Sequence, residues 1–304
     1  MRFRHARRLP PLPEPFPAPF RAMLDGLLAR SARITGARRE VARSRHRALE
    51  QTGTFVGHRP YAPGDDLRRI DWNAYARTGS LFVKLLAEDE RRATTVWLDL
   101  SASMRAGQPP RLLTALRLAA ILAGLALRHL DGVELCAGGQ ETFAGRGSVP
   151  QLLEHLGALG RAHDPTTAGP GADPGDVAVL LRRRRAPGKV HWISDFTGPA
   201  ATERALRRLR RGGFQVVGWL PTIPDDFAVE PCGWRTVVDP ETGAESALRL
   251  DRELAAAMTH ELQVLAQQQQ QVFANCGFPL QRVTLPTDAF EAARWLEAGW
   301  SFRR

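Results

Sequence analysis

The chain has 304 residues, of which 43% are hydrophobic and 24% charged, a composition typical of a soluble globular protein with one large or two modest domains. Its three cysteines, Cys136, Cys232 and Cys276, are widely separated, which excludes a disulfide scaffold and a zinc site built from close cysteine pairs. The net charge of +10 is concentrated in residues 1–50, where 12 arginines and 4 acidic residues leave +8.

A membrane span and a secretory signal are not expected. The best apolar stretch, 112–127, contains Arg117 and is shorter than the roughly 20 apolar residues that a span requires. The N-terminal MRFRHARRLP does not lead into an apolar signal core, so we expect a cytoplasmic protein. The basic arm is interpreted as a partly helical segment that packs on the rest of the chain, with an acidic partner or a membrane surface as alternatives. No basic motif interleaved with aromatic residues is present, so no nucleic-acid partner is expected.

The first 90 residues are predicted to form an extension. Residues 9–19 are proline-rich and extended, and residues 20–47 have a helical pattern with a break near Gly36. Residues 52–80 are dense in Gly, Asp, Arg and aromatic residues and follow neither regular period, which predicts an ordered but irregular segment. We therefore predict an N-terminal arm over 1–50, a segment over 51–90 that packs on the core, and a main domain over 91–304.

Beyond this extension, strands and helices alternate along the chain. Strands are predicted at 81–88, 94–100, 132–137, 141–145, 189–195, 214–221 and 278–285, helices at 110–130, 150–159, 173–185, 199–211, 250–275 and 288–297, and a peripheral hairpin at 234–239 and 245–250. The five glutamines at 267–271 are interpreted as a solvated helix face. The alternation predicts an α/β fold with a doubly wound, mostly parallel sheet and helices on both faces.

Oxygen-bearing side chains follow the two most apolar predicted strands. Asp99 lies at the end of the strand predicted at 94–100 and is followed by Ser101 and Ser103, and Asp195 ends the strand predicted at 189–195. Ligands of doubly wound sheets bind at the carboxyl ends of the strands, so these groups are expected at one edge. Hard oxygens suit Mg²⁺ or Mn²⁺. The alternative is that Asp99 and Ser101 only cap the following turn.

The pattern D-x-S-x-S at Asp99, Ser101 and Ser103 resembles the metal-ion-dependent adhesion site of von Willebrand factor A-like domains. That resemblance implies a Rossmann-like, doubly wound domain in which Asp195 supplies a further ligand. It also implies a threonine from an intervening loop, where Ala172 stands in this sequence, so that Thr166 or Thr167 would have to substitute.

A second motif lies upstream, in residues 53–104. Its characteristic residues are Arg59, Tyr61, Gly64, Asp65, Asp66, Arg68, Asp71, Trp72 and Arg77. Their order and spacing resemble the signature of the bacterial family known as domain of unknown function 58. This resemblance implies a protein partner, a MoxR-type AAA+ ATPase, for which members are thought to act as adaptors or co-chaperones.

Three interpretations of this signature remain open. The first is a network of arginine–carboxylate pairs, packed by Tyr61 and Trp72, that clamps the segment onto the sheet. The second is a surface that docks a partner, and the third is a catalytic pair of carboxylates. No base or nucleophile partner for such a pair is evident in the sequence.

The first functional hypothesis is therefore a non-enzymatic protein-interaction module with a Mg²⁺ or Mn²⁺ site. A metal-dependent hydrolase using the same site and a scaffold that has lost its metal are the alternatives. The sequence has neither a phosphate-binding G-x-x-x-x-G-K-[ST] loop nor a G-x-S-x-G nucleophile elbow. Ser101 occupies the place of the second aspartate of aspartyl phosphatases. His191, inside a predicted strand, is interpreted as a satisfied core or edge residue.

Overall fold

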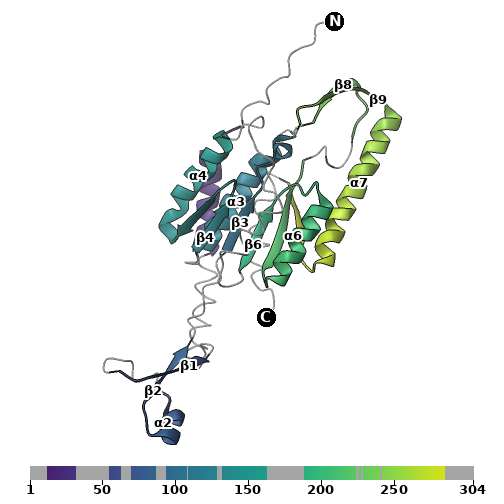
Figure 1. Cartoon of the computed structure of the whole chain (residues 1–304). Helices are drawn as coiled ribbons and strands as arrows, with labels where there is room; N and C mark the ends of the chain where they lie inside the picture. The colour runs from purple at the N-terminus through teal and green to yellow at the C-terminus, as the bar shows by residue number, and fades with distance from the viewer. Residues whose placement is uncertain are drawn as a thin grey trace. The chain divides into compact units, whose positions relative to one another are not determined.

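The computed structural model describes residues 12–31, 55–62, 70–86, 94–107, 109–128, 132–162, 188–223, 226, 229–239 and 242–284. The chain divides into two compact units (Figure 1). The larger unit contains residues 1–32 and 93–304, and the smaller unit contains residues 33–92. The helices predicted at 173–185 and 288–297 lie outside the described residues.

A six-stranded sheet forms the centre of the larger unit. The strands lie in the order β10-β7-β6-β3-β4-β5, and every neighbouring pair is parallel except β4 and β5. Their bounds are β3 (Thr94–Leu98), β4 (Gly132–Cys136), β5 (Gln140–Ala144), β6 (Lys189–Ile193), β7 (Gln215–Pro221) and β10 (Leu280–Val283). The predicted α/β class with a mostly parallel sheet is confirmed.

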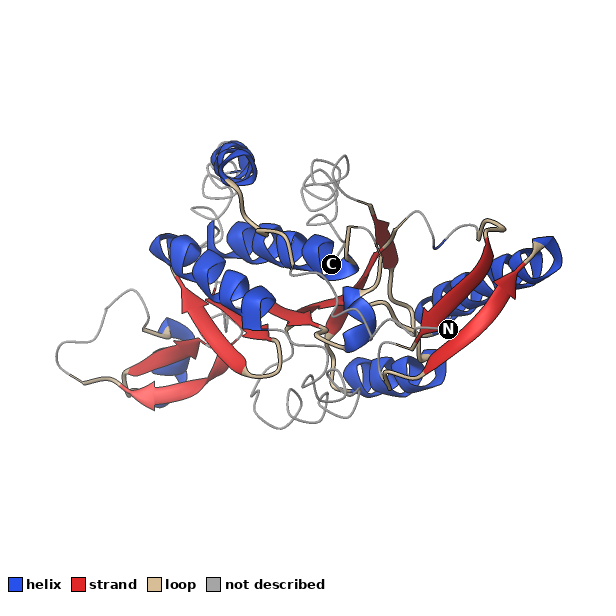
Figure 2. Cartoon of the chain, turned by 90° about the horizontal axis from the view of Figure 1, so that it is seen from above, coloured by secondary structure: helices blue, strands red, loops and turns tan. Residues whose placement is uncertain are grey.

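Helices cover both faces of this sheet, as Figure 2 shows in blue. Side chains alternate along a strand, so Val96 and Leu98 of β3 belong to one hydrophobic cluster and Trp97 to the other. The first cluster includes α3 (Arg111–Arg128) and α4 (Val149–Ala162), and the second includes α6 (Pro199–Arg211) and α7 (Arg252–Asn275). The continuous burial of β3 is what a parallel strand covered on both faces requires.

Part of the predicted N-terminal arm is a component of the core. Residues 18–31 are helical, and Phe20, Leu24 and Leu28 are buried in the first cluster. Arg117 of α3 donates a hydrogen bond to the Pro15 carbonyl at 2.8 Å and lies 5.5 Å from the centre of the Phe20 ring. This segment therefore packs on the rest of the chain, as the sequence interpretation expected, whereas residues 32–50 lie outside the described part.

The predicted hairpin is present between β7 and α7. It consists of β8 (Gly233–Val238) and β9 (Glu245–Leu250), which pair antiparallel and are largely exposed. No helix within the described residues is both long enough and apolar enough to cross a membrane.

The smaller unit contains the strand predicted at 81–88 and, in addition, a strand and a helix that the sequence analysis did not predict. Strand β1 (Phe55–Pro60) pairs antiparallel with β2 (Phe82–Leu86), and α2 (Trp72–Thr78) lies between them in the chain. The prediction of an irregular segment over 52–80 is therefore wrong for β1 and α2. Pairing with β2 stabilises β1 as a strand, although the composition of β1 does not favour one. The Asp71 carboxylate begins α2 by accepting hydrogen bonds from the amides of Asn73 and Ala74.

Candidate metal site

The two predicted aspartates lie at the carboxyl ends of adjacent parallel strands. Asp99 follows β3 and Asp195 follows β6 after one intervening residue, and the two strands are paired along their whole length. The Asp99 amide donates to the Ile193 carbonyl at 2.9 Å, which extends this pairing beyond the last strand residue. The side chains of Asp99, Ser101 and Asp195 are buried, with exposed fractions of 9%, 9% and 6%.

The loop after β3 is organised around the Asp99 carboxylate. One oxygen, Oδ1, accepts the Ser101 amide at 2.8 Å, and the other, Oδ2, accepts the Ser194 hydroxyl at 2.6 Å. The hydroxyls of Ser101 and Ser103 lie 3.0 Å apart and share a hydrogen bond. Asp99 thus caps the turn, as the alternative interpretation proposed, and also joins the two strand ends, whereas the Ser101 side chain makes no capping hydrogen bond.

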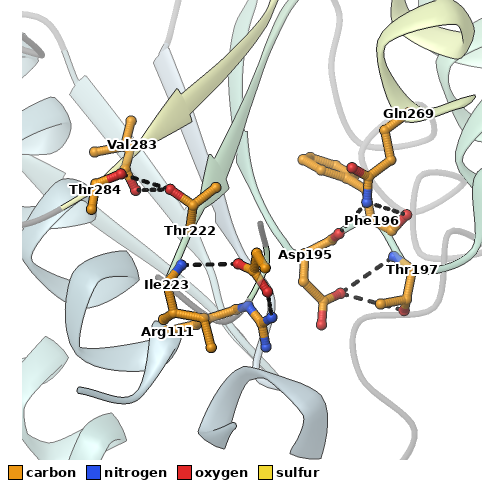
Figure 3. Close-up of polar contacts among 10 residues, drawn as sticks. Arg111, Asp195, Phe196, Thr197, Thr222, Ile223, Gln269, Val283 and Thr284 are labelled. Atoms are coloured by element: carbon orange, nitrogen blue, oxygen red, sulfur yellow. Dashed lines mark hydrogen bonds and ion pairs between the residues drawn. The ribbon is translucent and has the colours of Figure 1, made fainter. Parts of the chain in front are cut away.

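The loop after β6 leaves part of the second carboxylate without a partner. Asp195 Oδ1 accepts the amide and the hydroxyl of Thr197, both at 3.4 Å (Figure 3). Asp195 Oδ2 is buried and has no hydrogen-bond partner among the described residues. A buried carboxylate oxygen without a partner is costly and is a candidate ligand for a cation.

The surroundings of Asp195 favour its neutral form. Burial raises the pKa of Asp195 above its ordinary value, and the negative charge of Asp99 adds to this increase. The Ser103 hydroxyl, the Arg111 guanidinium and the Thr197 amide lower the pKa and offset part of it. A divalent cation between the two aspartates would favour the charged form of Asp195 instead, because it stabilises both carboxylates in their charged form.

A pocket of about 140 Å³ adjoins Asp195. Arg111, the first residue of α3, forms an ion pair with Asp226 on one side of it, and Asp226 also accepts the Ile223 amide at 2.9 Å. The side chain of Arg282 and apolar residues of α7 line the remainder. The pocket therefore combines an apolar wall with two guanidinium groups beside the second carboxylate.

These residues form a set of oxygens suited to a hard cation. Asp99, Ser101, Ser103 and Asp195 come together as the sequence predicts, and they could hold Mg²⁺ or Mn²⁺ with water molecules completing the shell. Within the described residues no group of three His, Cys, Asp or Glu side chains has metal-binding geometry, so hydroxyl oxygens are required. The threonine ligand that the resemblance implies is not located, because its candidate positions lie outside the described residues: Thr166, Thr167 and Ala172.

The sequence analysis missed the role of Ser194 at this edge. Its hydroxyl donates to Asp99 and accepts the Phe196 amide at 3.1 Å, so it ties the two loops together. Its position directly before Asp195 was the available signal. Arg111 carried no comparable signal, because a lone arginine at the start of a helix has no distinctive pattern.

His191 is not part of the site. It lies within β6, is 2% exposed and accepts a hydrogen bond from the Trp219 indole at 3.1 Å. Burial, together with the nearby positive charge of Lys189, lowers the pKa of His191 to about 3. The interpretation of His191 as a satisfied core residue is confirmed, and it offers no general base to the carboxylates.

The described part of the signature segment has structural roles within the smaller unit. Asp71 caps α2, and Arg77 donates to the Asn73 carbonyl at 3.2 Å. Trp72 is 62% exposed and contacts Tyr75 edge to face. Tyr61 is half-buried, and its amide donates to Leu81. The side chain of Arg59 and all of Gly64, Asp65, Asp66 and Arg68 lie outside the described residues.

Comparison with known proteins places this architecture in a family. The model of the family described as protein of unknown function DUF58 matches residues 57–271, and the chain belongs to this family. It is 28% identical over 247 residues to the uncharacterized proteins Mb1516 of Mycobacterium bovis and Rv1480 of Mycobacterium tuberculosis, covering 76% of this chain and 73% of each relative.

Two solved structures are also similar in part. One is an aerotolerance-related membrane protein from Bacteroides fragilis, with 19% identity and a TM-score of 0.41 over 66% of this chain and 96% of that one. The other is BatB from Bacteroides thetaiotaomicron, a conserved hypothetical protein, with 19% identity and a TM-score of 0.37 over 68% and 97%. These likenesses are too distant to carry an argument about function.

Proposed function

We propose that this protein is a non-enzymatic protein-interaction module with a von Willebrand factor A-like, Mg²⁺- or Mn²⁺-dependent site, and that it serves in the cytoplasm as an adaptor or co-chaperone of a MoxR-type AAA+ ATPase. The observation that carries the proposal is the meeting of Asp99, Ser101, Ser103 and Asp195 at the ends of β3 and β6. In the proposed site these groups hold the cation directly or through water.

The partner contributes the last oxygen in this proposal. Few protein ligands surround the cation, which leaves room for an aspartate or glutamate from another protein. Two guanidinium groups line the adjoining pocket; Arg111 is paired with Asp226 there, so Arg282 is the group that favours a negatively charged partner. Binding of the partner therefore requires both the metal and the partner's carboxylate.

The absence of a catalytic pair at this edge supports binding rather than hydrolysis. Within the described residues, the side chains of the site are two carboxylates and several hydroxyls. His191 lies within β6 and accepts a hydrogen bond from the Trp219 indole, so it does not act as a base for these hydroxyls. A hydroxyl nucleophile needs an adjacent general base. The serines here instead hydrogen-bond to each other and to Asp99.

Two measurements test the proposal on the full-length chain. Titration calorimetry with Mg²⁺ and with Mn²⁺ is expected to show binding by the wild-type protein and by Glu245→Gln, an exposed control on β9. Asp195→Asn is expected to lose this binding. Capture by an immobilised MoxR-type ATPase from the same organism is expected to require the metal and to fail in EDTA and with Asp195→Asn.

The possible outcomes separate the alternatives. Absence of heat at millimolar metal contradicts the proposed site and favours a scaffold without metal. Metal binding accompanied by capture that ignores EDTA contradicts the metal-bridged contact. Metal-dependent hydrolysis of phosphoesters or peptides by the purified protein, lost in Asp195→Asn, contradicts a non-enzymatic role.

A further inference from the structure

One glutamine of the 267–271 run differs from its neighbours. Gln269 is 6% exposed, whereas Gln267, Gln268, Gln270 and Gln271 are exposed. The solvated face predicted for these glutamines is therefore wrong at Gln269. A primary amide buried in this way requires hydrogen-bond partners, and its partners lie in the loop that carries Asp195.

The amide of Gln269 binds the backbone of that loop at two consecutive carbonyls. Its Nε2 donates to the Asp195 carbonyl at 2.9 Å and to the Phe196 carbonyl at 3.3 Å, as Figure 3 shows. Backbone carbonyls only accept hydrogen bonds, so the amide nitrogen must face them. Neither a carboxylate nor an apolar side chain can replace this pair of donations.

The loop needs such support because its backbone adopts an uncommon conformation. Phe196 has φ +50°, and among the described non-glycine residues it alone has a positive φ. The left-handed region is unfavourable for a bulky side chain and persists only where the surroundings enforce it. The Phe196 ring is held between Trp192 and Phe273, with ring centres 5.3 and 5.0 Å away.

Helix α7 supplies two of these constraints from one face. Gln269 and Phe273 are four residues apart and therefore lie one above the other on the helix. The first holds the loop carbonyls and the second packs against the Phe196 ring. On the N-terminal side of Asp195 in the chain, Ser194 binds Asp99. The direction in which the Asp195 carboxylate leaves the loop is thus fixed from both sides.

We propose that Gln269 is a positioning residue that holds Asp195 in place for the cation and its carboxylate partner. The inference rests on the proposed function, since it concerns the same site. Outer partners of this kind typically change metal affinity 10- to 100-fold when they are replaced. Gln269→Met keeps the length of the side chain but removes both donations, so Asp195 is released from its position.

The experiment measures Mn²⁺ affinity of the full chain by titration calorimetry. Gln269→Met is expected to weaken binding 10- to 100-fold. Gln270→Met, an exposed neighbour on the same helix, is expected to bind like the wild type. Leu152→Ala, a core truncation in α4 on the other face of the sheet, is expected to lower the unfolding temperature and leave affinity unchanged. Wild-type affinity in Gln269→Met, or equal weakening in Leu152→Ala, overturns the proposal.

A second readout works without metal and separates this inference from the proposed function. The backbone amide of Thr197, which donates to Asp195 Oδ1, reports the position of the carboxylate. Its chemical shift in labelled protein without metal is expected to change in Gln269→Met and to remain unchanged in Gln270→Met and Leu152→Ala. If the wild type binds no metal but this signal moves in Gln269→Met, the proposed metal site fails and the positioning role stands. An unmoved Thr197 signal in Gln269→Met overturns the positioning role even if the wild type binds Mn²⁺.

Discussion

The loops after β3 and β6 each present one buried aspartate at the same edge of the sheet, but their surroundings differ. Both oxygens of Asp99 accept hydrogen bonds of 2.6–2.8 Å. One oxygen of Asp195 accepts two hydrogen bonds of 3.4 Å, and the other has no hydrogen-bond partner in the described part of the chain. The first carboxylate is held by the Ser101 amide of its own loop and by the Ser194 hydroxyl of the second loop, whereas the backbone of the second loop is held by Gln269 of α7. The difference indicates that Asp99 organises this edge of the sheet, and it supports the proposed role of Asp195 as a cation ligand.

The largest expected effect is on the first loop. Asp99→Ala removes the acceptor of the Ser101 amide and of the Ser194 hydroxyl, and leaving two buried donors unpaired costs about 2–3 kcal/mol of unfolding free energy. Urea denaturation at neutral pH measures this loss. Asp99→Asn keeps one carbonyl oxygen as an acceptor and is expected to lose less than half as much. Equal stability of Asp99→Ala and the wild type would show that Asp99 does not organise the loop.

The strand beneath the second loop gives an effect whose size depends on the pH. The folded protein lowers the pKa of His191 to about 3, below the value of about 6.5 in the unfolded chain. Its contribution to stability is therefore complete above pH 6.5 and is lost as the pH falls toward 3, by about 1.4 kcal/mol for each pH unit between the two pKa values. Urea denaturation between pH 7 and pH 4 measures this slope.

Two variants isolate the contribution of His191. His191→Gln retains an acceptor for the Trp219 indole but does not titrate, so its stability is expected to fall less steeply with acid. His260→Gln, an exposed control on α7, is expected to follow the wild type. Parallel slopes for His191→Gln and the wild type would contradict a neutral, buried His191 and would assign the acid sensitivity to other groups.

The sequence predicted the places of the two aspartates because they follow apolar, β-branched runs that are typical of buried parallel strands. It also predicted the hairpin and the strand–helix order from hydrophobic periodicity. It did not predict β1, which becomes a strand through pairing with β2 rather than through its own composition. The role of Gln269 was not predictable either, because five consecutive glutamines carry no period that distinguishes the buried one. The left-handed conformation of Phe196 contradicts the preference of its residue type and depends on tertiary contacts.

The smallest effect expected tests the second loop directly. Because burial raises the pKa of Asp195, its ionised form destabilises the folded protein in the absence of metal. This destabilisation is absent below the unfolded pKa of about 3.9 and develops as the pH rises through the folded pKa. Asp195→Asn is expected to gain about 1 kcal/mol of unfolding free energy at neutral pH in EDTA, a gain of the size that single stabilising substitutions commonly give.

Thermal unfolding of the two proteins with and without metal gives the decisive comparison. In EDTA the variant is expected to unfold a few degrees above the wild type. With Mg²⁺ or Mn²⁺ the unfolding temperature of the wild type is expected to rise to that of the variant. A ligand that binds only the folded state stabilises it, and Asp195→Asn no longer binds the metal. If Asp195→Asn is less stable than the wild type in EDTA, the unpaired oxygen does not destabilise the protein. The two loops would then differ in hydrogen bonding alone.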